Sequence, residues 1–198
     1  MSDVVGVLAL QGAFDKHIEM LQALGVRCRR VRFAQELDEC AALIIPGGES
    51  TTMSLLIQKF DLYGRLCEFA KEKPMMGICA GAILMADEVG DSRVIALNVI
   101  PMTVVRNAYG RQVSSFSAEL RLKCDAGGPT YLAHFIRAPG IKSNNENIEV
   151  LAEYNGEAVM MRMGRNMVLT FHPELTNDSR IHVCWLKGFH PAYKQELL

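Results

Sequence analysis

One pentapeptide has the residue types of a nucleophile held on a sharp turn. Residues 77–81 read Gly-Ile-Cys-Ala-Gly, the cysteine form of the G-x-S-x-G nucleophile elbow. We expect residues 73–78 to form a short buried strand that runs into the turn and residues 80–86 to form the helix that leaves it. Because a helix dipole favours an anion at the helix N-terminus, Cys79 is the candidate nucleophile, acting as a thiolate.

A candidate base and a carboxylate to orient it lie close together near the end of the chain. His172 and Glu174 flank Pro173 and follow the apolar run 167–171. Since residues two apart in an extended segment project to the same side, we expect the imidazole and the carboxylate to lie together. A neutral imidazole oriented by a carboxylate is what a catalytic cysteine needs. The tripeptide alone is more typical of a turn after a strand, but together with the Cys79 elbow the catalytic interpretation is favoured.

Acyl transfer also needs hydrogen-bond donors for the oxyanion, and the sequence offers two sources. The backbone N–H of Ala80 follows the nucleophile at the predicted helix N-terminus. The second donor is expected from the loop 46–50, Pro-Gly-Gly-Glu-Ser, after another apolar run. Its paired glycines allow a peptide with positive φ or a peptide flip, and Ser50 or Thr51 is expected to cap the next helix. The alternative is a plain strand-to-helix turn, against which Glu49 argues because such a turn does not require a carboxylate.

The remaining histidines and cysteines have weaker signals. His17 and His182 fall on predicted helices, where we expect surface residues or satisfied core residues. His134 lies in a predicted strand beside Arg137, near enough to border the site, and His190 is close to the C-terminus. Buried structural thiols are the expectation for the other five cysteines, which are Cys28, Cys40, Cys67, Cys124 and Cys184.

Strand and helix patterns alternate through much of the chain. Buried strands are predicted at residues 4–10, 41–45, 73–78 and 167–171, and a more peripheral strand at 26–33. Helices are predicted at residues 14–24, 35–40, 51–59, 62–71, 80–86 and 178–188. Short strands at 94–105, 114–122, 130–136, 148–154 and 158–163 predict an antiparallel elaboration.

These patterns predict an α/β fold, a three-layer sandwich with a central, mostly parallel sheet and a small antiparallel β elaboration. We expect residues 1–198 to form a single domain. Active sites of such folds lie beyond the carboxyl ends of the parallel strands. Gln11-Gly12, Gly47-Gly48 and Cys79 all follow predicted strands, so they are expected to meet at one place.

Composition excludes several classes of function. Hydrophobic residues make up 49% of the 198 residues, charged residues 22%, and the formal net charge is −1. No strong field therefore favours nucleic acid or an anionic membrane, and no apolar run is long enough to span a membrane. The cysteines form no C-x-x-C pair, which argues against a zinc ribbon or a redox dithiol. Without a signal-peptide pattern, we expect reduced thiols and a cytoplasmic protein.

Taken together, the motifs resemble the class I glutamine amidotransferases, whose fold is flavodoxin-like and whose triad is Cys-His-Glu. Within that class the chain is most similar to the glutaminase subunits of pyridoxal 5′-phosphate synthases. The segments that carry this resemblance are residues 7–13, 46–53, 106–112, 135–139 and 171–176. The Gly-Gly-Glu-Ser-Thr-Thr-Met and Arg-Asn-x-[Phe/Tyr]-Gly-Arg-Gln segments are the most specific of these. The segment 87–94 departs from the family pattern by being shorter.

The resemblance implies hydrolysis of L-glutamine to glutamate and ammonia. It also implies transfer of the ammonia to a (β/α)8-barrel synthase subunit that builds pyridoxal 5′-phosphate, in a hetero-oligomer without a metal or cofactor in this chain. By carry-over, Cys79 is the nucleophile, His172 the general base and acid, and Glu174 its orienter. Gly48 and Ala80 would supply the oxyanion N–H groups.

The same resemblance implies a set of residues around the glutamine. Glu49 and Ser50 would border it, and Arg106 and Arg137, with Ile136, would hold its α-carboxylate and backbone end. An arginine suits a carboxylate because its fork of N–H donors matches two oxygens. We also hypothesise that the Gly47-Gly48 peptide leaves the oxyanion hole incomplete until the synthase docks.

Two other functions stay open at this point. Another thiol hydrolase on a similar α/β fold, acting on small peptides or as a deglycase, would share the cysteine elbow. It would not explain Arg106, Arg137 and Glu49 together. A non-catalytic regulatory partner would keep the fold, but the intact Cys79, His172 and Glu174 argue against it.

Overall fold

Seven strands form the central sheet of the computed structural model, which describes residues 3–105, 115–124, 128, 130–190 and 192–193. Their order is β10-β11-β12-β4-β3-β1-β2. The parallel part contains β2 (Cys28–Val31), β1 (Val5–Leu8), β3 (Ala42–Ile45), β4 (Met75–Ile78) and β12 (Asn166–Leu169). At one edge, β11 (Glu157–Met163) and β10 (Glu149–Tyr154) continue the sheet with antiparallel pairing. This order of the parallel strands is that of the flavodoxin-like sheet.

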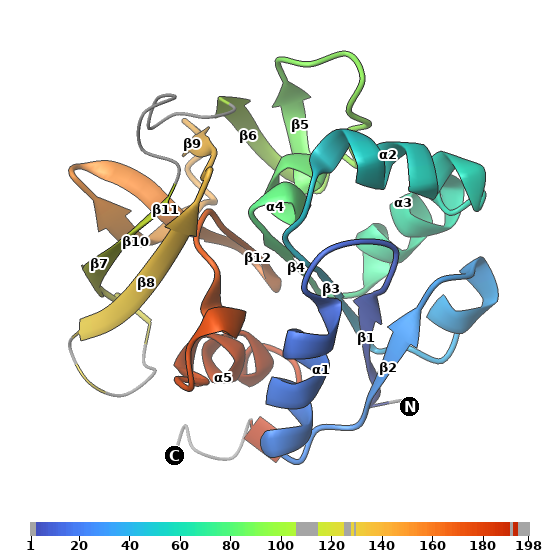
Figure 1. Cartoon of the computed structure of the whole chain (residues 1–198), viewed down its shortest axis with the longest axis horizontal. Helices are drawn as coiled ribbons and strands as arrows, with labels where there is room; N and C mark the ends of the chain where they lie inside the picture. The colour runs from blue at the N-terminus through green and yellow to red at the C-terminus, as the bar shows by residue number, and fades with distance from the viewer. Residues whose placement is uncertain (1–2, 106–114, 125–127, 129, 191, 194–198) are drawn as a thin grey trace.

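Helices cover both faces of the sheet (Figure 1). One face packs against α1 (Phe14–Ala23) and α5 (Arg180–Lys187). The other packs against α2 (Ser50–Lys59), α3 (Tyr63–Glu72) and α4 (Ala80–Met85). Strand β3 shows why the core has two layers, because successive side chains of a strand point to opposite faces of the sheet. Ala42 and Ile44 pack on the face covered by α1 and α5, and Leu43 and Ile45 pack on the face covered by α2, α3 and α4. The predicted three-layer α/β sandwich is confirmed.

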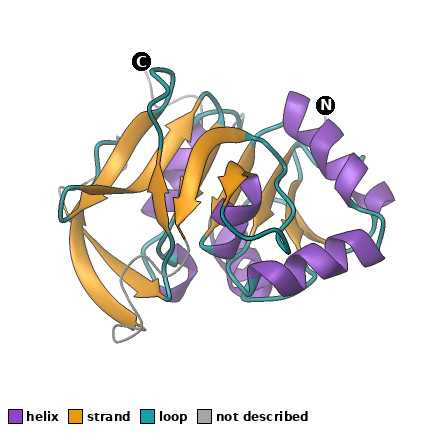
Figure 2. Cartoon of the chain, turned by 90° about the horizontal axis from the view of Figure 1, so that it is seen from above, coloured by secondary structure: helices purple, strands orange, loops and turns teal. Residues whose placement is uncertain are grey.

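Two smaller sheets carry the elaboration, and strands gather at one end of the molecule in Figure 2. One contains β5 (Ala86–Val89), β6 (Ile100–Val105) and β9 (Gly140–Lys142). The other sheet pairs β7 (Ser115–Arg121) with β8 (Thr130–Ile136). The chain also forms two short 3₁₀ turns, η1 (Ala34–Leu37) and η2 (Pro173–Leu175).

The elaboration differs from the prediction in two ways. Strands β5 and β9 were not expected, and β5 pairs with β6 in parallel. Strands β10 and β11 are antiparallel as predicted and extend the main sheet. Strand β5 has a weak signal because it follows α4 without a turn residue and exposes Asp87 and Glu88. The carboxylate of Glu88 accepts a hydrogen bond from Thr103 Oγ1 at 2.7 Å, which links β5 to β6.

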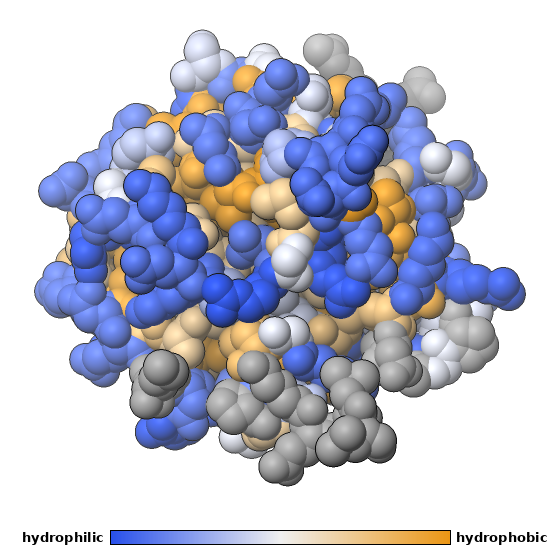
Figure 3. Space-filling model, turned by 180° about the vertical axis from the view of Figure 1, so that it is seen from behind, coloured by the Kyte–Doolittle hydropathy of each residue, from blue (hydrophilic) through white to orange (hydrophobic). Residues whose placement is uncertain are grey.

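On the side seen in Figure 3, hydrophilic side chains cover much of the described surface, with hydrophobic patches between them. Within the described ranges, no helix combines the length and the apolar character needed to cross a bilayer.

Helix α4 packs unusually close to strand β3, and Gly81 makes this possible. A Cβ atom built on Gly81 would lie 2.1 Å from the backbone oxygen of Ile45. A Cβ on Gly77 would lie 2.7 Å from the backbone oxygen of Gly81. Because the obstacle at Gly81 is backbone and not a flexible side chain, the strand or the helix would have to move. The two glycines of the elbow therefore fix where Cys79 lies above the sheet.

We predict that Gly81→Ala lowers the free energy of unfolding by about 3 kcal/mol, because the added methyl overpacks a contact with backbone. Gly64→Ala is the matched control, since Gly64 also lies in a helix and a Cβ there meets nothing within 4 Å. That control is expected to raise stability by up to about 1 kcal/mol through helix propensity. Chemical denaturation followed by circular dichroism measures both. Equal stability of Gly81→Ala and wild type would contradict the close approach.

Candidate active site

The carboxyl ends of β1, β3, β4 and β12 surround one cavity of about 440 Å³, a size typical of small-molecule sites. The loops that follow these four strands supply most of its lining. The lining residues are Gln11, Gly12, Ala13, Gly47, Gly48, Glu49, Ser50, Cys79, Ala80, Ile83, Ile136, Arg137, Pro139, His172, Glu174 and Leu175. The sequence motifs that follow separate strands therefore meet at one place, as the strand order requires.

Cys79 occupies the turn between β4 and α4 with a strained backbone. Its φ is 49° and its ψ is −101°, in a region that non-glycine residues rarely adopt. Such strain costs about 1–3 kcal/mol and is characteristic of nucleophile elbows. Two hydrogen bonds hold the turn: the Cys79 N–H donates to Leu169 O at 2.8 Å, and Cys79 O accepts from the Ile83 N–H at 3.1 Å. The thiol consequently lies in the cavity, at the N-terminus of α4.

His172 lies beside the cysteine and is held from behind by Glu174. The Nδ1 atom of His172 is 2.7 Å from Oε1 of Glu174, and both side chains are almost completely buried. The expected extended segment is wrong, because residues 173–175 form the 3₁₀ turn η2. Pro173 begins this turn with its fixed φ, and the turn brings Glu174 back under the imidazole. The backbone N–H of His172 donates to His134 O at 2.8 Å, which ties His172 to β8.

The surroundings of His172 favour its protonated form. Burial opposes a charge on the imidazole, but the nearby Cys79 side chain and the hydrogen-bonded carboxylate of Glu174 outweigh it. Together they raise the pKa of His172 from 6.5 to about 10. The protonated form of the imidazole is therefore favoured next to the side chain of Cys79.

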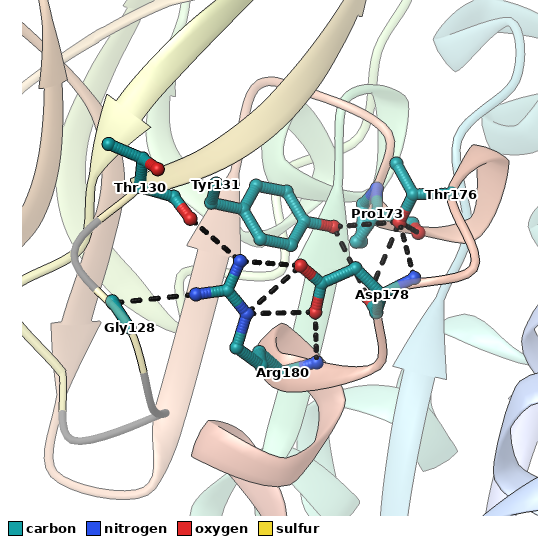
Figure 4. A network of polar contacts seen from close by, with 7 residues as sticks. All are labelled: Gly128, Thr130, Tyr131, Pro173, Thr176, Asp178 and Arg180. Carbon is teal, nitrogen blue, oxygen red and sulfur yellow. Dashed lines mark hydrogen bonds and ion pairs between the residues drawn. The ribbon is translucent and has the colours of Figure 1, made fainter.

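A polar network anchors the segment that follows η2 (Figure 4). The guanidinium of Arg180 donates to Thr130 O at 2.7 Å and pairs with the carboxylate of Asp178 at 2.6 Å. The hydroxyl groups of Tyr131 and Thr176 share a hydrogen bond of 3.1 Å, and Thr176 Oγ1 also donates to Pro173 O. These bonds connect β8, η2 and α5. The position of Glu174 is thus fixed from three elements.

The loop after β3 requires glycine because neighbouring side chains leave no room for a Cβ atom, and not because its backbone has a positive φ. Neither Gly47 nor Gly48 has a positive φ in the structure. A Cβ on Gly47 would lie 2.5 Å from Cε1 of His172, and a Cβ on Gly48 would lie 2.3 Å from Oε1 of Gln11. The same Gln11 oxygen accepts a hydrogen bond from the Glu49 N–H at 2.8 Å. The sequence predicted that Gln11 lies at this edge of the sheet, but it did not indicate that the Gln11 side chain holds the loop after β3.

Glu49 has a structural task that the sequence analysis did not anticipate. Its carboxylate accepts hydrogen bonds from the backbone N–H groups of Thr51 and Thr52, and so it caps α2. The expected cap by Ser50 or Thr51 is wrong. Burial raises the pKa of Glu49, but the bonds from both threonines outweigh it and lower the pKa to about 2. The Ser50 hydroxyl is left buried at the cavity, with no partner for its Oγ among the described residues.

Ile136 and Arg137 border the cavity at the end of β8. Ile136 O lies 3.8 Å from the Cys79 sulfur. Arg137 directly follows the last residue of β8, has a φ of 45° and is exposed. Arg106, expected to act with Arg137, lies outside the described residues together with the rest of segment 106–112.

The other titratable side chains show one unexpected contact. His17 and His182 are completely buried and contact each other, and His17 also faces Glu174. His190 is buried too, with Nε2 3.2 Å from Asp3 O, and His134 reaches the site only through its backbone oxygen. No cluster of three or more histidine, cysteine or acidic side chains suited to a metal occurs in the part of the chain that the structure describes.

Known proteins resemble this chain over most of its length. A family model described as the SNO glutamine amidotransferase family matches residues 7–190. The pyridoxal 5′-phosphate synthase subunit PdxT of Desulforamulus reducens is 46% identical over 185 residues, which cover 93% of this chain and 98% of that protein. The protein of the same name from Thermosipho africanus is 46% identical over 183 residues, covering 92% and 96%.

Solved structures agree with the fold. One described as a glutamine amidotransferase has a TM-score of 0.86 and 39% identity, and the match covers 93% of this chain and 97% of that one. A putative GMP synthase protein from Thermoplasma acidophilum has a TM-score of 0.69 over 99% of this chain and 98% of its own. At 15% identity, this second likeness concerns the fold alone.

Three independent features thus point the same way: the order of the parallel strands, the cysteine elbow facing a buried histidine and glutamate, and sequence identity near one half over nearly the whole chain. The matched region includes every residue that lines the cavity. The chain belongs to the SNO glutamine amidotransferase family.

Proposed function

We propose that this protein is the glutaminase of a pyridoxal 5′-phosphate synthase, hydrolysing L-glutamine to L-glutamate and ammonia. The observation that carries the proposal is the alignment of three side chains in one cavity: Cys79 at a helix N-terminus, His172 beside it, and Glu174 at 2.7 Å behind the imidazole. The family match and relatives named pyridoxal 5′-phosphate synthase subunits support this substrate and this role.

The chemistry follows from the protonation states. The Cys79 thiolate attacks the side-chain amide carbon of glutamine, and the carbonyl oxygen becomes an oxyanion. The imidazolium of His172 then donates its proton to the departing nitrogen, which leaves ammonia and a thioester on Cys79. The neutral imidazole next removes a proton from water, whose oxygen attacks the thioester and releases glutamate. Glu174 stabilises each imidazolium and keeps the ring oriented.

The oxyanion needs hydrogen-bond donors that are aimed at it when the transition state forms. The first N–H groups of a helix have no partner within the helix, so the Ala80 N–H is available beside the nucleophile. We assign the second donor to Gly48, whose loop borders the same cavity and is held by Gln11. Losing one such donor typically costs about 3–4 kcal/mol in the transition state.

The polar end of glutamine has its own set of proposed contacts. Arg137 borders the cavity and, with Arg106 and the neighbouring Ile136, would hold the α-carboxylate. Ser50 offers a buried hydroxyl without a partner among the described residues, which suits a bond to the substrate. Glu49 borders the cavity, although its carboxylate is engaged in capping α2.

We further propose that residues 1–198 act as one glutamine amidotransferase domain in the cytoplasm, in a hetero-oligomer with a synthase subunit of (β/α)8-barrel fold. The family model spans residues 7–190, which supports one domain. The relatives are named as subunits, which supports a partner that uses the ammonia.

We predict that Cys79→Ala lowers the rate of glutamate formation from glutamine by about 10⁴-fold or more, because the covalent step is lost. Cys67→Ala is the control, since Cys67 is a half-buried thiol on α3, outside the cavity. Glutamate release is measured with the synthase present, and folding is checked by circular dichroism. Wild-type turnover by Cys79→Ala would refute the nucleophile. A wild-type protein that hydrolyses peptide amides and not glutamine would favour another thiol hydrolase.

The charge on His172 gives a second prediction. Its imidazole is expected to stay protonated through neutral pH and to titrate near the pKa of about 10, because Cys79 and Glu174 stabilise the cation. Glu174→Gln removes one of these charges and should lower the midpoint by about 1–3 pH units. NMR titration of histidine Cε1–H signals measures both, with Glu153→Gln as a surface control that pairs with Lys123. A wild-type midpoint near 6.5 would contradict the ion pair.

The partner gives a third prediction. If docking of the synthase sets the Gly47-Gly48 peptide, the cognate synthase should raise the rate of glutamate formation several-fold over the free chain. The same mass of an unrelated protein serves as the control. Equal rates with and without the synthase would show that the oxyanion donors need no partner.

A further inference from the structure

The carboxylate of Glu174 has a second neighbour that the proposed mechanism does not use. Its side chain is completely buried, with Oε1 2.7 Å from Nδ1 of His172. The other oxygen, Oε2, lies 3.6 Å from Nε2 of His17, which is also completely buried. His17 comes from α1 and does not line the cavity, unlike the base His172. A fixed charge thus stands between two imidazoles.

His17 is held in turn by a third imidazole. Its Nδ1 atom is 2.9 Å from Nε2 of His182, and the two ring centres are 5.2 Å apart. His182 comes from α5 and is completely buried. The line of polar atoms therefore runs from the cavity through η2 and α1 to α5, beneath the surface along its whole length.

Both of these histidines are neutral near pH 7. Burial, followed by the nearby His182 and His172, holds the pKa of His17 well below its usual range. Burial lowers the pKa of His182 to about 4. The charged groups of α1 itself, Asp15, Lys16 and Glu19, are exposed to solvent, unlike the buried pair.

A neutral imidazole carries one proton, and the neighbours determine where it lies. Oε2 of an ionised Glu174 only accepts hydrogen bonds, so the proton of His17 belongs on Nε2. Nδ1 of His17 is then an acceptor, and His182 must donate from its Nε2. In the opposite tautomer, Nε2 of His17 would be an acceptor facing Oε2 of Glu174, which is also an acceptor. Neither atom has another partner among the described residues that could relieve this contact. Their separation exceeds a direct hydrogen bond by only a few tenths of an ångström.

We propose that His17 is a positioning residue for glutamine hydrolysis: as the Nε2–H tautomer, oriented by His182, it holds the rear oxygen of Glu174 so that the front oxygen stays on His172. The proposal rests on the glutaminase function above. His17 does not line the cavity, so its loss should act on the orientation of the base and not on substrate binding. A carboxylate released at one oxygen can rotate, and the imidazole it orients then loses its alignment with Cys79.

The direct test is the tautomer of His17 in the wild-type protein. Long-range ¹H–¹⁵N NMR distinguishes the two neutral forms, and the His17→Gln spectrum assigns the signals. The expected result is a neutral Nε2–H imidazole at pH 7 whose shifts do not change between pH 6 and 9. An Nδ1–H tautomer or a cationic His17 would overturn the proposal. This measurement needs no substrate, so it stands even if the glutaminase function were wrong.

Variants then separate positioning from packing. His17→Leu fills the space without a donor, and we expect kcat to fall about 10- to 100-fold with KM within about twofold of wild type. His17→Gln places an amide N–H near the former Nε2 and should recover most of that loss. His190→Leu, which removes another buried histidine that contacts Asp3 O, is the matched control with unchanged kcat.

Two outcomes in these variants would overturn the proposal. One is a folded His17→Leu protein with wild-type kcat. The other is an equal loss in His17→Leu and His17→Gln, which would assign the residue to packing alone. If His17→Leu does not fold, the wild-type tautomer and the His17→Gln kinetics decide. Absence of glutamine hydrolysis in wild type, with the Nε2–H tautomer present, would refute the function and leave the hydrogen-bond arrangement intact.

Discussion

The buried carboxylate of Glu174 is the constraint on which the rest of the site depends. A charge removed from water is tolerated only when it is paired and hydrogen-bonded, and Glu174 has an imidazole on each side. One of them, His172, has a raised pKa as a result, so its cationic form is favoured beside Cys79. The charge that favours a cationic His172 in the cavity thus comes from Glu174, whose own side chain is almost completely buried.

Such a charge must be fixed in position, and the fold does this with short connections. The turn η2 is anchored through Thr176, Asp178 and Arg180 to β8 and α5. On the opposite side, the absent side chain of Gly47 leaves room for the His172 ring, and that of Gly81 lets α4 approach β3. The geometry of this site therefore depends on the absence of side chains at Gly47 and Gly81 as well as on the side chains that are present.

The sequence predicted the framework well because buried parallel strands are continuous apolar runs that end at glycine-rich turns. It therefore located the loops after β1, β3, β4 and β12 and the cysteine elbow. It failed where tertiary contacts override local pattern. His-Pro-Glu forms a 3₁₀ turn and not an extended segment. Strand β5 pairs with β6 in parallel, because strand partners are not encoded in periodicity. Segment 106–112 lies outside the described residues, so its predicted arginine contact stays a prediction.

His17 shows which features of a buried polar residue can be predicted from local sequence and which cannot. It occupies the buried face of α1 with Ile18 and Leu21, where helical periodicity favours an apolar residue. A buried imidazole at such a position must find polar partners, because leaving both ring nitrogens unpaired in the core is costly. Its partner His182 is 165 residues further along the chain, so no local pattern reveals the pair. The polar exception on an apolar helix face was nevertheless visible in the sequence, and the structure places it between the buried side chains of Glu174 and His182.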